Sequence, residues 1–256
     1  MSDHKAARLA AIRAANGARL AGSTQDSMAT TRDGLDQGEA VSFSALLTML
    51  MGSLIGVALA VFIVPLWLPD LSNSILSTQP KVYWYLSRSS AVVAYALLWL
   101  SMLFGLLITS KMSGLWPGGP TAFDLHQYTS LLGLTFALFH ALILMGDTYI
   151  KATLAQIVTP FSYTGYQPLW VGLGQLALYG LMLVGMSFYV KQYIGRGMWR
   201  LIHFLSFGIF ILALGHGIWS GTDTSSELMR AMYWGSGGSV LFLTIFRILG
   251  SARASA

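Results

Sequence analysis

Four of the five histidines in this 256-residue chain lie in two apolar segments, and this placement constrains the fold and the chemistry more than any other feature. The first segment, HQYTSLLGLTFALFH, begins at His126 and ends at His140; the second, HFLSFGIFILALGH, begins at His203 and ends at His216. Imidazole is the commonest metal ligand among side chains, and it is costly to bury in hydrocarbon without a partner. Two helices with two imidazoles each can therefore hold two metal centres, one above the other.

Six apolar runs predict a membrane protein, because each is near the roughly 20 residues that cross about 30 Å of hydrocarbon. The chain is 55% hydrophobic and 10% charged, whereas charged residues make up about a quarter of a soluble domain. Short connections predict an all-α, six-transmembrane helix bundle over residues 41–250. A polar tail, partly disordered or amphipathic, is expected at 1–40, and a short tail at 251–256. The runs are approximately 43–68, 83–110, 125–145, 169–190, 200–219 and 232–249.

The distribution of charge predicts the orientation of these spans. Eleven of the fifteen Lys and Arg residues fall on the side of the N-terminus, so both termini are expected in the cytoplasm, in the cell inner (plasma) membrane. The first span is expected to stay as an anchor, because residues 1–40 lack the apolar core of a cleaved signal peptide. The net charge of +5 is assigned to the cytoplasmic side and not to nucleic-acid binding. The absence of cysteine excludes disulfides and iron–sulfur clusters.

The spacing of the histidines predicts two levels. Fourteen residues separate His126 from His140, so both rings leave one face of an ideal helix about 21 Å apart. Thirteen residues separate His203 from His216, which leaves these rings about 140° apart. Helix tilt, a distortion near Gly208 or Gly215, or a sideways offset of the two centres would absorb this difference. Spans three and five run parallel, which puts the first histidine of each near the cytoplasmic face and the second near the outer face.

Four histidines in two level pairs favour two bis-histidine b-type haems between helices three and five. A single membrane histidine is more often a hydrogen-bonding group or a proton relay. Zinc would need all its ligands around one ion, and chlorophyll takes only one axial histidine. Arg88 lies about one and a half turns inside its span. It either snorkels to the headgroups or binds a haem propionate in the bidentate geometry that suits arginine.

The stretches WYLSRSSAVVAYALLWLSMLFGLLITSK, PGGPTAFDLHQYTSLLGLTFALFH and WRLIHFLSFGIFILALGHG resemble the ferric-reductase-like transmembrane family. This family includes the membrane halves of ferric reductases and NADPH oxidases, and the haem subunit of a bacterial periplasmic methionine-sulfoxide reductase system. The resemblance covers about residues 80–250 and rests on the two histidine spacings. It implies that His126 and His203 ligate an inner haem. It implies further that His140 and His216 ligate an outer haem, and that Arg88 and Arg200 are propionate partners.

The chain departs from this family at its end. Ferric reductases continue into a flavin- and nicotinamide-binding domain, whereas this chain stops within ten residues of the last span and has no Gly-rich nucleotide fingerprint. The leading hypothesis is therefore an electron-transfer subunit in membrane lipid, an oxidoreductase component without catalytic residues of its own. A separate flavoprotein, ferredoxin or quinol is expected to donate electrons near Lys191, Arg196 and Arg200. An acceptor or partner subunit is expected on the outer side, under the 146–168 loop.

Two other functions remain open at this point. One is an accessory haem- or tetrapyrrole-binding subunit of a larger respiratory or photosynthetic membrane complex. The other is a haem-free transporter in which the histidines relay protons. The pigment bound by the purified chain distinguishes the three functions. The electron-transfer subunit requires protohaem, the accessory subunit requires another tetrapyrrole such as bacteriochlorophyll, and the transporter requires no pigment.

Overall fold

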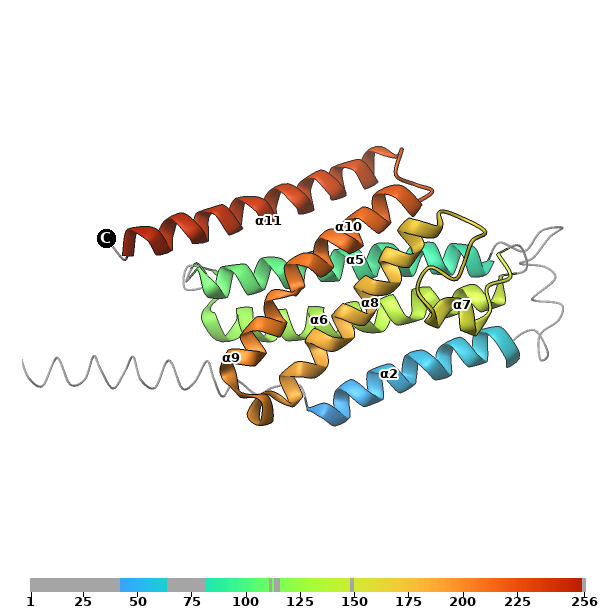
Figure 1. The fold of residues 1–256 in the computed structure, drawn as a ribbon, viewed down its shortest axis with the longest axis horizontal. Helices are drawn as coiled ribbons and strands as arrows, with labels where there is room; N and C mark the ends of the chain where they lie inside the picture. Colours follow the sequence, from blue (N-terminus) through green and yellow to red (C-terminus); the bar gives the residue numbers. More distant parts are fainter. Residues whose placement is uncertain (1–41, 64–81, 111, 113–115, 148–149, 255–256) are drawn as a thin grey trace, which may run out of the picture. The chain divides into compact units, whose positions relative to one another are not determined.

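The structure is a computed structural model, and it describes residues 42–63, 82–110, 112, 116–147 and 150–254. The described residues form helices joined by turns and short connections, with no strand among them (Figure 1). The predicted all-α class is therefore confirmed. The elements in chain order are α2 (Phe43–Ala58), the π-helical turn η1 (Leu59–Ile63), α5 (Val82–Thr109), α6 (Gly119–Ile143), the 3₁₀ turn η3 (Leu144–Gly146), α7 (Leu154–Val158), α8 (Pro168–Tyr189), α9 (Lys191–Phe204), α10 (Ser206–Ser220) and α11 (Glu227–Ala254).

Five helical segments in the described part of the chain are long and apolar enough to cross a membrane. These helices are consistent with a multi-pass membrane protein. The first predicted span is represented by the shorter apolar helix α2 and by η1. Its last residues, 64–68, lie outside the described residues, as does the predicted tail at 1–40. The five segments are Val82–Thr109, Gly119–Gly146, Pro168–Tyr189, Lys191–Ser220 and Glu227–Gly250.

The third predicted span begins earlier than its apolar run. The sequence predicts this span at 125–145, but α6 already begins at Gly119. Pro120 occupies the first turn of the helix, where its missing N–H removes no hydrogen bond and its fixed φ is already helical. The last helix, α11, likewise extends at both ends beyond the predicted run of 232–249.

The fifth predicted span consists of two helices, α9 and α10, which meet at Leu205. The backbone N–H of Leu205 donates to the carbonyl of Ile202 at 3.0 Å, a bond of the 3₁₀ type. Such a turn winds by about 120° per residue in place of about 100°. The extra rotation turns the second histidine of this span toward the face of the first, so it absorbs part of the 140° offset. The distortion falls at a leucine and not at one of the glycines.

Helices α5 and α6 lie side by side, and α8 and α10 run obliquely across them (Figure 1). The approach of α5 to α6 is close at Gly133, where a Cβ atom would lie 3.4 Å from Cβ of Leu97. Helix α11 is joined to α5 by two hydrogen bonds: Tyr95 Oη lies 2.6 Å from Ser236 Oγ, and Trp99 Nε1 donates to Ser239 Oγ at 2.9 Å. The main apolar cluster of buried residues comprises Tyr95, Leu98, Met102, Leu106, Phe210, Met229, Tyr233, Val240 and Leu243.

Candidate functional site

The structure brings the four histidines together in two pairs, at two levels of α6. His126 of α6 faces His203 of α9, with ring centroids 6.0 Å apart. His140 of α6 faces His216 of α10, with ring centroids 6.2 Å apart. A metal–imidazole bond is about 2 Å long and the ring centre lies about 1 Å behind the nitrogen, so two imidazoles on opposite sides of one ion have centres about 6 Å apart. Both pairs have the separation expected of two axial ligands.

Both histidines of α6 are oriented by serines of α5. Nδ1 of His126 donates to the backbone carbonyl of Ser101 at 2.8 Å, and Nδ1 of His140 donates to that of Ser87 at 2.8 Å. The two serines are fourteen residues apart, as are the two histidines. Fourteen residues make about four helical turns, so two antiparallel helices can repeat the same contact at both levels. A carbonyl can only accept, so the proton is on Nδ1 and the lone pair is on Nε2. Nε2 of each ring is therefore prepared to bind a metal.

His216 is oriented by α8. Its Nδ1 donates to the backbone carbonyl of Trp170 at 2.8 Å, which again leaves the lone pair on Nε2. Gly174 makes room for the ring, because a Cβ atom at this position would lie 2.5 Å from Nδ1 of His216. The indole of Trp170 stacks on that of Trp219, with centroids 4.1 Å apart and planes 7° from parallel. Backbone carbonyls thus fix three of the four imidazoles.

His203 is held differently. Its ring stacks on the indole of Trp199, with centroids 5.1 Å apart and planes at 26°. Nζ of Lys191 lies 4.7 Å from the centre of the Trp199 ring. Among the described residues, none forms a hydrogen bond with the His203 ring. Stacking fixes the plane of an imidazole but leaves open which nitrogen carries the proton.

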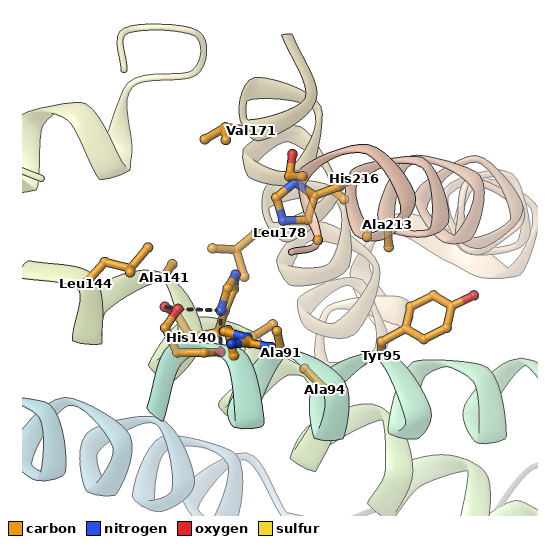
Figure 2. Close-up of a pocket in the computed structure, with 18 of the residues that line it drawn as sticks. Ala91, Ala94, Tyr95, His140, Ala141, Leu144, Val171, Leu178, Ala213 and His216 are labelled. Atoms are coloured by element: carbon orange, nitrogen blue, oxygen red, sulfur yellow. Dashed lines mark hydrogen bonds between the residues drawn. The ribbon is translucent and has the colours of Figure 1, made fainter. Parts of the chain in front are cut away.

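A cavity of about 1110 Å³ surrounds the pair formed by His140 and His216, and Figure 2 shows the two rings reaching into it from different helices. Its volume is slightly above the usual range of roughly 300–1,000 Å³ for cofactor and ligand sites. The space exists because small residues of four helices line it. Apolar side chains such as Leu144, Val171 and Leu178 complete the walls. The small residues include Ala91, Ala94, Gly133, Ala137, Ala141, Ala177 and Ala213.

Arg88 lines the same cavity and forms an ion pair with Asp223, which lies in the turn between α10 and α11. Its guanidinium also lies 4.1 Å from the centre of the Trp84 ring, in a cation–π contact. The predicted site residue Arg88 thus lies at the cavity, and its carboxylate partner was not predicted from the sequence. Arg200, the other predicted arginine, is exposed on α9, one turn before His203.

Ser87 and Ser101 were not among the site residues predicted from the sequence, although the sequence contains a signal for them. Ser87 and Ser101 are buried hydroxyl residues in an apolar span, and their spacing repeats that of the histidines of α6. Gly174 has no such signal, because glycine is common in membrane helices. Within the described residues, no three His, Cys, Asp or Glu side chains converge on one point, so these residues offer two ligands to each centre.

The fold and the site define a helical, multi-pass membrane protein with two facing histidine pairs. Residues 82–223 match the model of a family described as a domain of unknown function (DUF8596), and the chain belongs to this family. The matched region covers more than half of the chain and contains both histidine pairs, Ser87, Ser101 and the ion pair of Arg88. Comparison with curated proteins and with solved structures finds no match.

Proposed function

We propose that this protein is a di-haem b membrane subunit that carries single electrons between a donor on one side of the membrane and an acceptor on the other. The observation that carries the proposal is the geometry of the two histidine pairs. Each pair has the centroid separation of axial ligands, 6.0 and 6.2 Å, and in each pair the α6 histidine has a carbonyl acceptor for Nδ1. We also propose that the resemblance to the ferric-reductase-like transmembrane family reflects a relationship.

The residues fit two haems in the following way. His126 and His203 would hold the inner haem through Nε2, and His140 and His216 would hold the outer one. Haem iron supplies one-electron redox chemistry when it is bound. The chain orients the imidazoles and would set the potential through ligand basicity, burial and nearby charge.

The charged groups near each pair suit the propionates of a haem. Arg88 would bind an outer propionate at the rim of the cavity, where Asp223 already fixes its position. Arg200 would meet an inner propionate from its place on α9, since it lies one turn from His203. A guanidinium matches a carboxylate in bidentate geometry and remains charged under all physiological conditions.

Orientation follows from the distribution of charge. With six spans and both termini in the cytoplasm, the pair of His126 and His203 lies on the inner side of the plasma membrane. The donor, a flavoprotein, ferredoxin or quinol, would meet the chain near Lys191, Arg196 and Arg200. The acceptor would meet it near the segment that contains α7, which contributes Gln156 and Ile157 to the outer cavity.

The haem content of the purified chain tests this function. A pyridine haemochrome assay should give two protohaems per chain, with the optical spectrum of low-spin, six-coordinate iron, because imidazole fills both axial positions. Clearly fewer than two haems per chain in a fully loaded preparation would contradict the proposal. Bacteriochlorophyll in its place would support an accessory subunit of a photosynthetic complex, and a colourless protein would support a haem-free transporter.

A further inference from the structure

The four histidines are not equivalent, and the difference is concentrated at one residue. His126, His140 and His216 each donate from Nδ1 to a backbone carbonyl at 2.8 Å. No residue in the described part of the chain accepts from or donates to the ring of His203, which stacks on Trp199. Partners of this kind fix the tautomer of a metal-bound imidazole and raise its basicity. Their loss typically weakens metal binding roughly 10- to 100-fold.

The helix that carries His203 is also the least anchored of those that carry histidines. Helix α9 contains no buried residue, whereas α10 buries Ile209 and Phe210, and α6 buries several residues, including Leu134. The chain leaves regular helical geometry on both sides of His203, at Gly195, which has φ 78°, and at Leu205. Phe204, the next residue, is 68% exposed. A small movement of α9 therefore displaces His203 without opening the core.

We propose that His203 is the exchangeable one of the four ligands, and that it would give up its place at an inner haem to a small neutral diatomic molecule of the carbon monoxide and nitric oxide type. The inference rests on the proposed function, because it requires a haem between His126 and His203. Nε2 of His203 would release its bond to the haem, and the incoming molecule would take the position that the imidazole leaves. No electron is transferred. His126 stays bound, because the carbonyl of Ser101 holds its Nδ1 proton.

The tautomer explains why the exchange favours the incoming molecule. Once displaced, the imidazole of His203 can carry its proton on Nε2, and in this form it cannot rebind through that nitrogen. At the other three histidines the carbonyl keeps the proton on Nδ1, so a displaced ring is ready to rebind at once. The outer iron, whose two ligands His140 and His216 are both held in this way, should stay six-coordinate.

Carbon monoxide titration of the full chain tests the proposal. The chain is purified with its haem content measured, reduced with dithionite and titrated with carbon monoxide while optical difference spectra are recorded. One molecule should bind per two haems. If two haems are present and reduced but carbon monoxide binds to neither, the proposal is overturned while the proposed function stands. If the haems are absent, the proposed function itself fails.

Variants identify which iron binds. His126→Ala should remove the inner haem and abolish carbon monoxide binding, whereas His140→Ala should remove the outer haem and leave one molecule bound per remaining haem. Binding that persists in His126→Ala with its outer haem in place would overturn the proposal. Trp199→Leu should raise the rate of binding several-fold in flash photolysis, since it removes the stacking partner of His203. Trp199→Phe keeps an aromatic ring and is the matched control, with a rate near that of the wild type.

Discussion

The backbone carbonyl of Ser87 accepts a hydrogen bond from Nδ1 of His140 at 2.8 Å, and this contact joins α5 to α6 at the pair formed by His140 and His216. This acceptor belongs to the backbone, so it remains when the side chain is replaced. The Ser87 hydroxyl adds two contacts, because its Oγ lies 2.9 Å from Nδ1 of His140 and donates to the backbone carbonyl of His140 at 3.1 Å. The same relationship recurs at the inner level, between Ser101 and His126. Helices α5 and α6 thus form one rigid half of both sites.

This arrangement predicts which change at position 87 matters. Ser87→Ala keeps the carbonyl and should retain the outer haem at near wild-type occupancy. Ser87→Leu should lose it selectively, because position 87 is buried at 3% exposure and a larger side chain separates α5 from α6. Ser89→Leu, two residues away on the exposed face, is the control and should keep both haems. Haem-to-protein ratios of the three purified variants check this, and loss of the outer haem in Ser87→Ala would contradict it.

Replacing the ligands should remove different haems. His140→Ala and His216→Ala should each deplete the outer haem and leave the inner one largely intact, because their rings face each other across one cavity. His126→Ala and His203→Ala should do the reverse. Redox titration, in which each haem is followed by its own midpoint potential, distinguishes the two outcomes. If His126→Ala and His216→Ala behaved alike, the assignment of the pairs would be wrong.

The helices themselves could be predicted from the sequence, because each apolar run of sufficient length has few alternatives to a helix in a membrane. The level of the two histidine pairs could also be predicted, since it follows from two parallel spans and from spacings of thirteen and fourteen residues. The break at Leu205 could not. The apolar pattern continues across Leu205, and no proline interrupts it. The break consists of little more than one hydrogen bond, which joins residues three apart in place of four.

The partners of the site residues were the other part that the sequence left open. Asp223 is a 44% exposed carboxylate in a turn, and nothing in its neighbourhood marks it as the partner of an arginine more than 130 residues earlier. That pairing depends on where the turn after α10 lies relative to α5, which no local pattern encodes. The backbone carbonyls of Ser87 and Trp170 likewise cannot be predicted as partners from side-chain types, because every residue has such a carbonyl.

The ion pair predicts opposite shifts in the potential of the outer haem. Arg88→Ala should lower its midpoint potential, because loss of a nearby cation disfavours the reduced and more negative haem. Asp223→Asn should raise it, because it removes an anion from the same rim. Partial exposure of both groups limits each shift to the order of a few tens of millivolts. Redox titration measures both, with the inner haem as internal reference. No shift at either haem would mean that Arg88 serves only to anchor α5 at the headgroups.

A glycine of α8 provides the sharpest test of the outer site. Gly174→Ala should weaken binding of the outer haem roughly 10- to 100-fold, as expected when a ligand loses its hydrogen-bonding partner. The reason is geometric: the new Cβ atom would lie 2.5 Å from Nδ1 of His216, so the ring must move away from the carbonyl of Trp170. The inner haem should be unaffected, because neither of its ligands is on α8 or α10.

Gly185→Ala is the matched control for this prediction, since it makes the same change on the same helix. A Cβ atom there would find its nearest neighbour, Cδ2 of Leu134, at 3.9 Å, which is ordinary contact. Alanine is also preferred over glycine in a helix interior by about 1 kcal/mol. Gly185→Ala should therefore keep both haems and unfold at the same or a slightly higher temperature. Full occupancy of the outer haem in Gly174→Ala, with an unchanged spectrum, would show that His216 does not need its present orientation to bind.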